Sequence, residues 1–141
     1  MTLYVLDTDH ISLYQKLHPQ IVSRVQAANA QEVAVTIISA EEQLRGWFDA
    51  IRQATSGERL RWAYLGLRQG IEYFNTIRVL DLNQAALNRY LALRAAKIRI
   101  GTQDLRIASI VLSINGILIT RNRRDFAQVP GLKIEDWTAA S

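Results

Sequence analysis

Short apolar runs alternate with longer helical patterns along this chain of 141 residues. Apolar, often β-branched runs predict buried strands. Neighbouring parallel strands need a crossover connection, which is usually a helix. The alternation therefore predicts an α/β fold, a three-layer α/β/α sandwich around a mostly parallel sheet of four or five strands. The expected strands are the run that ends at Leu6, residues 33–38, 76–80 and 117–120, and a short edge strand at 132–134.

Helical patterns fill the intervals between these runs. Proline is favoured in the first turn of a helix, and glycine is favoured just after the last turn. The chain shows no linker, repeat or low-complexity segment, so we expect one domain over residues 1–141. The expected helices cover residues 20–30 with Pro19 in the first turn, 40–54 and 58–74 as a hairpin broken at 55–57, a segment holding Leu87, Leu91, Arg94 and Ile98, and 103–114 followed by Gly116.

The composition excludes several classes of protein. The chain is 49% apolar with only 2 prolines and 7 glycines, which is too apolar for intrinsic disorder. It has no cysteine, so a disulfide framework, a thiolate metal site and a thiol nucleophile are excluded. The first residues lack the basic start of a signal peptide, and the longest uncharged stretch, 107–120, is shorter than the ~20 residues of a membrane-spanning helix. We expect a globular protein of the cytoplasm.

The charge balance favours an anionic partner without naming one. The formal net charge is +4, and arginine supplies most of the 17 basic residues. Guanidinium groups suit phosphate and carboxylate. A solvated basic surface would carry the same charge.

Acidic side chains follow the first predicted strand. Asp7 comes directly after Leu6, and Asp9 lies two residues further on. In open parallel sheets, ligands gather beyond the carboxyl ends of the strands. A carboxylate at this edge is a candidate metal ligand. Alternatively, Asp7 or Asp9 caps the helix that begins near His10.

After the second strand, both glutamates have simpler local roles open to them. Ser39 and Glu42 have the spacing of a capping box, in which the glutamate folds back on the start of its own helix. Glu41 and Arg45 have the spacing of an exposed ion pair on a helix. Neither glutamate identifies a site by itself.

The polar residues near the start of the last long helix and after the fourth strand also have local explanations. Asp104 follows Thr102, a candidate N-cap, and its charge would favour the helix dipole. Asn122 and Asp125 come after the fourth strand and suit an ordinary turn.

Taken together, these positions predict a shared pocket. The topology brings strand ends together, so we expect Asp7, Glu42 and Asp104 to lie close together, with Asn122 or Asp125 beside them. Clustered carboxylates raise one another's pKa, so such a cluster usually binds a cation. Oxygen ligands favour Mg²⁺ or Mn²⁺. A divalent ion there activates water for the hydrolysis of a phosphodiester, and the number of acids leaves room for two ions.

A basic turn lies beside the predicted pocket. Arg121, Arg123 and Arg124 are suited to hold a polyanionic backbone. The alternative is a solvated basic turn.

Four segments of the chain resemble the PIN-domain ribonucleases, and among them the VapC-type toxins of bacterial toxin–antitoxin modules. They frame nearly the whole chain, and residues 47–102 match only in helical character. The resemblance implies a compact PIN-like α/β/α fold and Mg²⁺- or Mn²⁺-dependent cleavage of RNA. The segments are LDTDHIS at 6–12, TIISAEEQLRG at 36–46, QDLRIAS at 103–109 and ILITRNRRDFAQVPGLKIEDW at 117–137.

The resemblance also implies roles for the acids. Asp7, Glu42 and Asp104 match the family's catalytic, metal-binding acids. Glu42 is preferred to Glu41 because the family's glutamate precedes a glycine by four positions, and that glycine is Gly46 here.

At the fourth position the chain departs from the family. Asn122 stands where relatives often carry an acid, and it would give a metal ion an oxygen without a charge. Asp125 matches the later acid of the same turn and is a candidate catalytic residue. Thr120 would hydrogen-bond near the site, and Asp9 would support or extend the metal shell.

The partners that the resemblance implies are an RNA substrate, a cognate antitoxin and a second copy of the chain. Antitoxins of this kind are small DNA-binding proteins whose tail occupies a groove of the toxin, and an acidic tail would complement a basic chain. Aromatic residues of the predicted hairpin would line that groove or the dimer contact, although core packing is the ordinary role at helical spacing. These residues are Trp47, Phe48, Trp62, Tyr64, Tyr73 and Phe74.

Two other functions fit part of the sequence. Asp7 and Asp9 are also similar to the Asp-x-Asp pair of haloacid-dehalogenase-type phosphatases, but Ile11 stands where those have Thr or Val. A non-catalytic PIN-like module that binds RNA or a partner would follow if Asn122 weakens the site. We assign His10 a packing or capping role rather than proton transfer.

Overall fold

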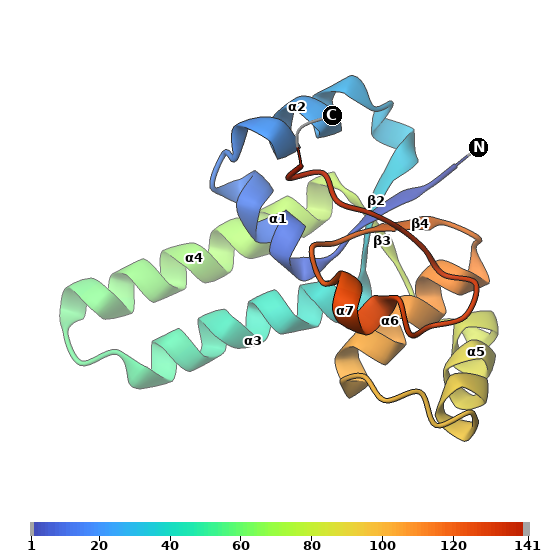
Figure 1. The fold of residues 1–141 in the computed structure, drawn as a ribbon. Helices are drawn as coiled ribbons and strands as arrows, with labels where there is room; N and C mark the ends of the chain where they lie inside the picture. The colour runs from blue at the N-terminus through green and yellow to red at the C-terminus, as the bar shows by residue number, and fades with distance from the viewer. Residues whose placement is uncertain (1, 140–141) are drawn as a thin grey trace.

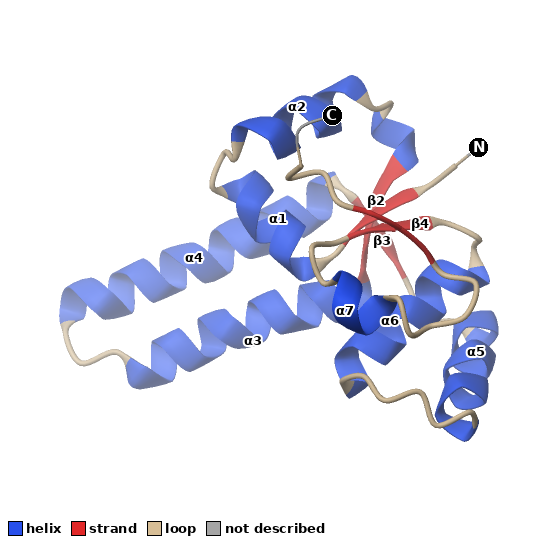
Figure 2. Ribbon diagram, in the orientation of Figure 1, coloured by secondary structure: helices blue, strands red, loops and turns tan. Residues whose placement is uncertain are grey.

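The computed structural model describes residues 2–139, and its strands form one sheet (Figures 1 and 2). The strands are β1 (Tyr4–Leu6), β2 (Val33–Thr36), β3 (Arg78–Leu80), β4 (Ile117–Ile119) and β5 (Lys133–Glu135). Their order is β3-β2-β1-β4-β5, and every neighbouring pair is parallel. The predicted sheet is confirmed, with five strands that are all parallel. Its central strand β1 therefore ends beside the ends of β2 and β4.

Helices follow the strands and cover both faces of the sheet (Figure 2). Among the described residues, none of them is long and apolar enough to cross a membrane. They are α1 (Thr8–Gln15), α2 (Pro19–Ala27), the 3₁₀ turn η1 (Ala30–Glu32), α3 (Ile37–Gln53), α4 (Gly57–Thr76), α5 (Gln84–Ala95), α6 (Thr102–Ser113) and α7 (Arg123–Phe126).

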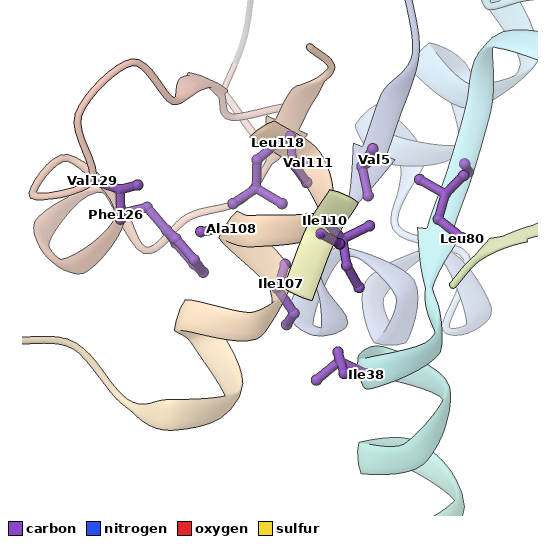
Figure 3. Close-up of a cluster of buried hydrophobic side chains, with 12 residues drawn as sticks. Val5, Ile38, Leu80, Ile107, Ala108, Ile110, Val111, Leu118, Phe126 and Val129 are labelled. Atoms are coloured by element: carbon purple, nitrogen blue, oxygen red, sulfur yellow. The ribbon is translucent and has the colours of Figure 1, made fainter. Parts of the chain in front are cut away.

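Successive side chains of a strand point to opposite faces of the sheet, so the sheet contributes to two apolar clusters, one on each face. These clusters hold the layers together. Val5 and Leu118 face a cluster that includes α6 and Phe126 of α7 (Figure 3). Leu6 and Ile119 face a second cluster, which includes buried residues of α1 and α2. This division confirms the predicted three-layer α/β/α arrangement.

The predicted helical hairpin is formed by α3 and α4, which extend away from the sheet (Figure 1). Trp47 of α3 packs against α4 at Gly66, where an added Cβ would clash with the indole ring. Its ring also meets Trp62 edge-on, with ring centroids 5.1 Å apart. The contact therefore requires glycine at position 66.

At two places a helix replaces the predicted end of a strand. The Thr36 hydroxyl accepts a hydrogen bond from the Ser39 N–H at 3.1 Å, so α3 begins at Ile37 and β2 ends at Thr36. Helix α4 runs to Thr76, and β3 begins at Arg78. The other strands agree with the prediction to within one residue.

Three helix ends also differ from the prediction. Helices α2 and α5 stop at Ala27 and Ala95, both short of their predicted ends. After α6, Asn115 and not Gly116 adopts the left-handed conformation, with φ of 52°. Gly116 has a different role, because a Cβ there would stand 3.1 Å from the Leu3 carbonyl oxygen.

Candidate active site

Asp7 lies at the carboxyl end of β1 and is buried, with 7% of its surface exposed. Its Oδ1 accepts a hydrogen bond from the Thr8 N–H at 2.8 Å and caps α1. Its Oδ2 accepts a hydrogen bond from the Thr120 hydroxyl at 2.8 Å, which ties β1 to the residue after β4. The helix-capping role and a place in the pocket are therefore compatible in this residue.

The environment of Asp7 disfavours its charged form. Burial raises the pKa of Asp7 to about 6, and the charges of Asp9 and Asp104 push it in the same direction. The hydrogen bonds from Thr120 and Thr8 oppose this rise without cancelling it. A buried carboxylate among like charges is suited to binding a cation.

Glu42 points towards the start of α1 and not back to its own helix start. The alternative capping box for Ser39 and Glu42 is wrong, because Thr36 is the N-cap of α3 and Ser39 lies within the helix. This change frees the Glu42 carboxylate, whose Oε1 accepts a hydrogen bond from the Thr8 hydroxyl at 2.8 Å. The same hydroxyl lies 2.9 Å from Ser39 Oγ. Glu42 is therefore bonded to the residue that directly follows Asp7.

Asp104 lies in the first turn of α6, which begins at Thr102 after Gly101 as N-cap residue. The predicted Thr102 cap is wrong, and the Gly101 cap supplies no side-chain hydrogen bond. Burial raises the pKa of Asp104, and the charges of Glu42, Asp125 and Asp9 raise it further. The charges of these acids therefore act on Asp104, and its role in binding a metal ion stays a prediction.

Asn122 and Asp125 are hydrogen-bonded to each other in the turn after β4. Asn122 caps α7, with its Oδ1 accepting from the Asp125 N–H at 3.3 Å. Its Nδ2 donates to Asp125 Oδ2 at 3.1 Å, and its backbone N–H donates to the Thr120 hydroxyl at 3.0 Å. The amide oxygen is already used by the cap, whereas Asp125 acts on Asp104 through its charge.

Asp9 stands at the rim of the acids and has basic partners. Burial raises the pKa of Asp9, but the hydrogen bonds and charges of His10 and Arg121 outweigh it and hold the pKa below its ordinary value. His10 is fully buried and also accepts a hydrogen bond from the Trp137 N–H at 3.2 Å. Sequence reasoning missed this contact, since no pattern links residues that meet only through the strand order.

The remaining charged residues follow simple local patterns. Glu41 and Arg45 form the predicted exposed ion pair, with 2.6 Å between Oε2 and Nη2. Arg121 bonds Asp9 through Nε at 3.2 Å, and its side chain is half exposed. Arg123 and Arg124 are exposed and, within residues 2–139, form no ion pair.

The acids fit a divalent cation by their chemistry. Asp7, Glu42 and Asp104 offer only oxygen donors, and within the described part of the chain no lysine or arginine pairs with them. As the side chains stand, residues 2–139 contain no group of three or more His, Asp or Glu positioned to hold a metal ion. Binding an ion would therefore require these carboxylates to move closer together.

A groove of about 880 Å³ lies between α1, α2 and the α3–α4 hairpin. Three of the six aromatic residues considered above line it, namely Trp47, Trp62 and Tyr73. Phe74 packs against the second apolar cluster, and Phe48 and Tyr64 are about half exposed. Lys16 is the one charged residue among the described residues that line the groove.

Comparison with known proteins places this geometry in a family. No protein-family profile matches the chain. Ribonuclease VapC1 of Haemophilus influenzae strain R2866 is 30% identical over 138 residues, which cover 96% of this chain and 98% of that protein. The tRNA(fMet)-specific endonuclease VapC of Salmonella typhimurium is 26% identical over 141 residues, covering 97% and 99%.

The fold agrees with the sequence match. The solved structure of VapBC-1 from nontypeable Haemophilus influenzae superposes with a TM-score of 0.77 at 26% identity, covering 98% of this chain and 100% of that one. This superposition confirms the PIN-like fold that the four segments implied. Since the Haemophilus ribonuclease matches at 30% identity over almost the full length of both proteins, this chain belongs to the VapC family.

Proposed function

We propose that this chain is a Mg²⁺- or Mn²⁺-dependent endoribonuclease and the toxin of a VapBC-type toxin–antitoxin pair. One observation carries the proposal: Asp104 is near enough for its charge to act on Asp7, Glu42 is near enough to act on Asp104, and none of the three has a basic partner among the described residues. The full-length similarity to proteins named as a ribonuclease and an endonuclease supports the same activity.

Asp7, Glu42 and Asp104 would hold the ion in this proposal. When bound, Mg²⁺ or Mn²⁺ supplies positive charge to a phosphoryl oxygen and lowers the pKa of a water molecule, the attacking group in phosphodiester hydrolysis. Two hydroxyl groups position the acids. Thr120 fixes one oxygen of Asp7, and Thr8 fixes one oxygen of Glu42.

For the fourth position we favour Asp125 over Asn122. The amide oxygen of Asn122 is engaged as the cap of α7, and its Nδ2 holds one oxygen of Asp125. Asp125 keeps a second oxygen and lies near enough to raise the pKa of Asp104. Asn122 then acts by aiming Asp125 at the other acids.

We further propose that the antitoxin places an apolar, acidic segment in the groove between α1, α2 and the hairpin. The groove offers aromatic surfaces from Trp47, Trp62 and Tyr73 and a positive charge from Lys16. The chain's net charge of +4 favours an acidic partner. Solved relatives are VapBC complexes, which supports a partner of this kind.

The active unit in this proposal is a homodimer. Exposed apolar side chains on α4 support burial against a second copy, since Tyr64 is 55% and Leu65 53% exposed. Light scattering on the purified chain tests this point directly. A monomer at micromolar concentration would contradict it.

The test of the activity is cleavage of RNA by the purified chain, freed of co-purifying protein. The name of the Salmonella relative makes initiator tRNA the first substrate to try, followed by total RNA. Discrete fragments with Mg²⁺ or Mn²⁺ are expected, and both EDTA and Asp7→Asn should abolish them. Folded protein that cleaves no RNA would contradict the proposal and favour a binding module, and turnover of a phosphomonoester would favour a phosphatase.

A further inference from the structure

Both carboxylate oxygens of Asp9 are already bonded within the protein. Oδ1 lies 2.9 Å from His10 Nδ1, and Oδ2 accepts a hydrogen bond from Arg121 Nε at 3.2 Å. Asp9 follows Asp7 closely in sequence, yet its oxygens are turned to these two partners. Its role is therefore different from that of the unpaired acids beside it.

The bonding of His10 fixes which of its nitrogens carries the proton. The Trp137 N–H can only donate, so His10 Nε2 must accept that bond and carry no hydrogen. The hydrogen of a neutral imidazole is then on Nδ1, where it is donated to Asp9. Trp137 is itself buried and packs on Tyr4, with ring centroids 5.3 Å apart. Asp9 is thus hydrogen-bonded to a fully buried ring whose other nitrogen is engaged by the Trp137 N–H.

Arg121 uses only part of its guanidinium group to reach Asp9. Within residues 2–139 its two Nη groups make no hydrogen bond to the protein, and its side chain is 52% exposed. It directly follows Thr120, whose hydroxyl is bonded to Asp7. The acid cluster consists of Asp7, Asp9, Glu42, Asp104 and Asp125. Within the described chain, Arg121 is the one arginine or lysine that forms a salt bridge with any of them.

We propose that Arg121 binds a phosphate group of the RNA backbone at the edge of the acid cluster, and that Asp9 and His10 are positioning residues that hold it there. This inference rests on the proposed RNA-cleaving function. The guanidinium fork binds a carboxylate on one side and leaves its amino groups for phosphate oxygens. An arginine held in place loses less side-chain entropy on binding than a free one.

The bond to Asp9 distinguishes Arg121 from its neighbours in the basic turn. Arg123 and Arg124 are exposed and form no salt bridge among the described residues, so no ion pair holds their guanidinium groups in place. Asp9 also differs from Asp7, Glu42 and Asp104 in having a basic partner, so an ion at its carboxylate would compete with the charge of Arg121.

The first experiment measures RNA affinity without cleavage. Fluorescence anisotropy of a labelled single-stranded RNA in EDTA, at several salt concentrations, compares the wild type with Arg121→Gln. Losing one phosphate contact should weaken binding on the order of 10- to 100-fold and reduce the slope of log K against log salt by roughly 0.7. Arg52→Gln is the matched control, since Arg52 also pairs with an aspartate but lies at the far end of α3.

The second experiment tests positioning through His10. Asn at position 10 can place an N–H where Nδ1 stands, whereas Gln can place an oxygen where Nε2 stands. His10→Asn should therefore keep RNA affinity close to the wild type, and His10→Gln should lose roughly 3- to 10-fold, as for one hydrogen bond. A purely structural role would lower the thermal stability of both variants and leave the salt slope of both unchanged.

A double-mutant cycle completes the test with Asp9→Asn. If Asp9 acts through Arg121, the double variant should bind RNA no more weakly than Arg121→Gln alone. The dependence of cleavage on Mn²⁺ concentration should be the same in Asp9→Asn as in the wild type. A raised Mn²⁺ requirement would make Asp9 a metal ligand and overturn the proposal.

The outcomes separate this inference from the proposed function. RNA cleavage that is intact in Arg121→Gln, with an unchanged salt slope, would refute the role of Arg121 and leave the ribonuclease assignment standing. Failure of the wild type to bind or cleave RNA would overturn both.

Discussion

Asp7 should make the metal-free protein less stable at neutral pH than at pH 4. Burial raises the pKa of Asp7 from 3.8 to about 6. A folded state with the higher pKa binds the proton more tightly than the unfolded state, so the free energy of unfolding falls as the pH rises from the lower value to the higher. Above about pH 7 this contribution no longer changes.

The size of the effect follows from the two pKa values. A pKa difference of about 2 corresponds to about 3 kcal/mol, at about 1.36 kcal/mol for each pKa unit. Solvent screening removes little of it, because Asp7 is only 7% exposed. Asp7→Asn carries no charge at any pH and can keep the hydrogen bond from the Thr8 N–H. The Thr120 hydroxyl can turn and accept from the new amide.

The assay is urea unfolding of the wild type and of Asp7→Asn from pH 4 to pH 8 in EDTA. Taking the difference between the two proteins removes most contributions of other titrating groups. The advantage of Asp7→Asn should grow by about 2.4 kcal/mol between the ends of this range, because the unfolded-state carboxyl is already half ionised at pH 4. A difference that stays constant with pH, or that shrinks as the pH rises, would refute the claim that Asp7 is buried without a compensating charge.

The remaining predictions concern the metal, the hairpin and Glu42. Mn²⁺ at about 100 times its Kd should raise the free energy of unfolding by about 2.7 kcal/mol, and an equal thermal shift in Asp104→Asn would contradict its role as a ligand. Gly46→Ala should stabilise the protein by about 0.5–1 kcal/mol, since a Cβ there meets nothing within 4 Å. Gly66→Ala should destabilise it by about 1–3 kcal/mol through the Trp47 ring, so urea unfolding that ranks the two alike would contradict this packing. Thr8→Val should lower RNA cleavage roughly 10-fold by releasing Glu42, as expected for a hydrogen bond to a charged group, whereas full activity would show that this bond is dispensable.

The elements that position the site could be predicted from local patterns. The β-branched runs that end near Asp7, Thr36 and Thr120 are buried strands, and parallel strands carry their carboxyl ends to one edge. That rule places Asp7 at one edge of the sheet, whereas Asp104 approaches it from the first turn of α6, near enough for its charge to raise the pKa of Asp7. The assignment of catalytic and metal-binding roles to them stays a prediction.

What could not be predicted depended on contacts between distant segments. Thr36 and Ser39 both suit an N-cap position; Thr36 fills it at the end of β2, and Glu42 is left free to bond Thr8. The contact between His10 and Trp137 follows from the strand order, since β5 lies beside β4 at the edge of the sheet. Local sequence patterns carry no signal for either.

The central place of β1 has a consequence for how the protein is made. One neighbour of β1 is β4, and the Thr120 hydroxyl that fixes Asp7 follows that strand, so these partners leave the ribosome long after the first strand. Contacts between residues so far apart in sequence form late in folding. A nascent chain that ends before Thr120 holds all of the α3–α4 hairpin but cannot fix Asp7. We expect truncation anywhere before Thr120 to remove the activity completely, so synthesis of this chain yields no partly active intermediates.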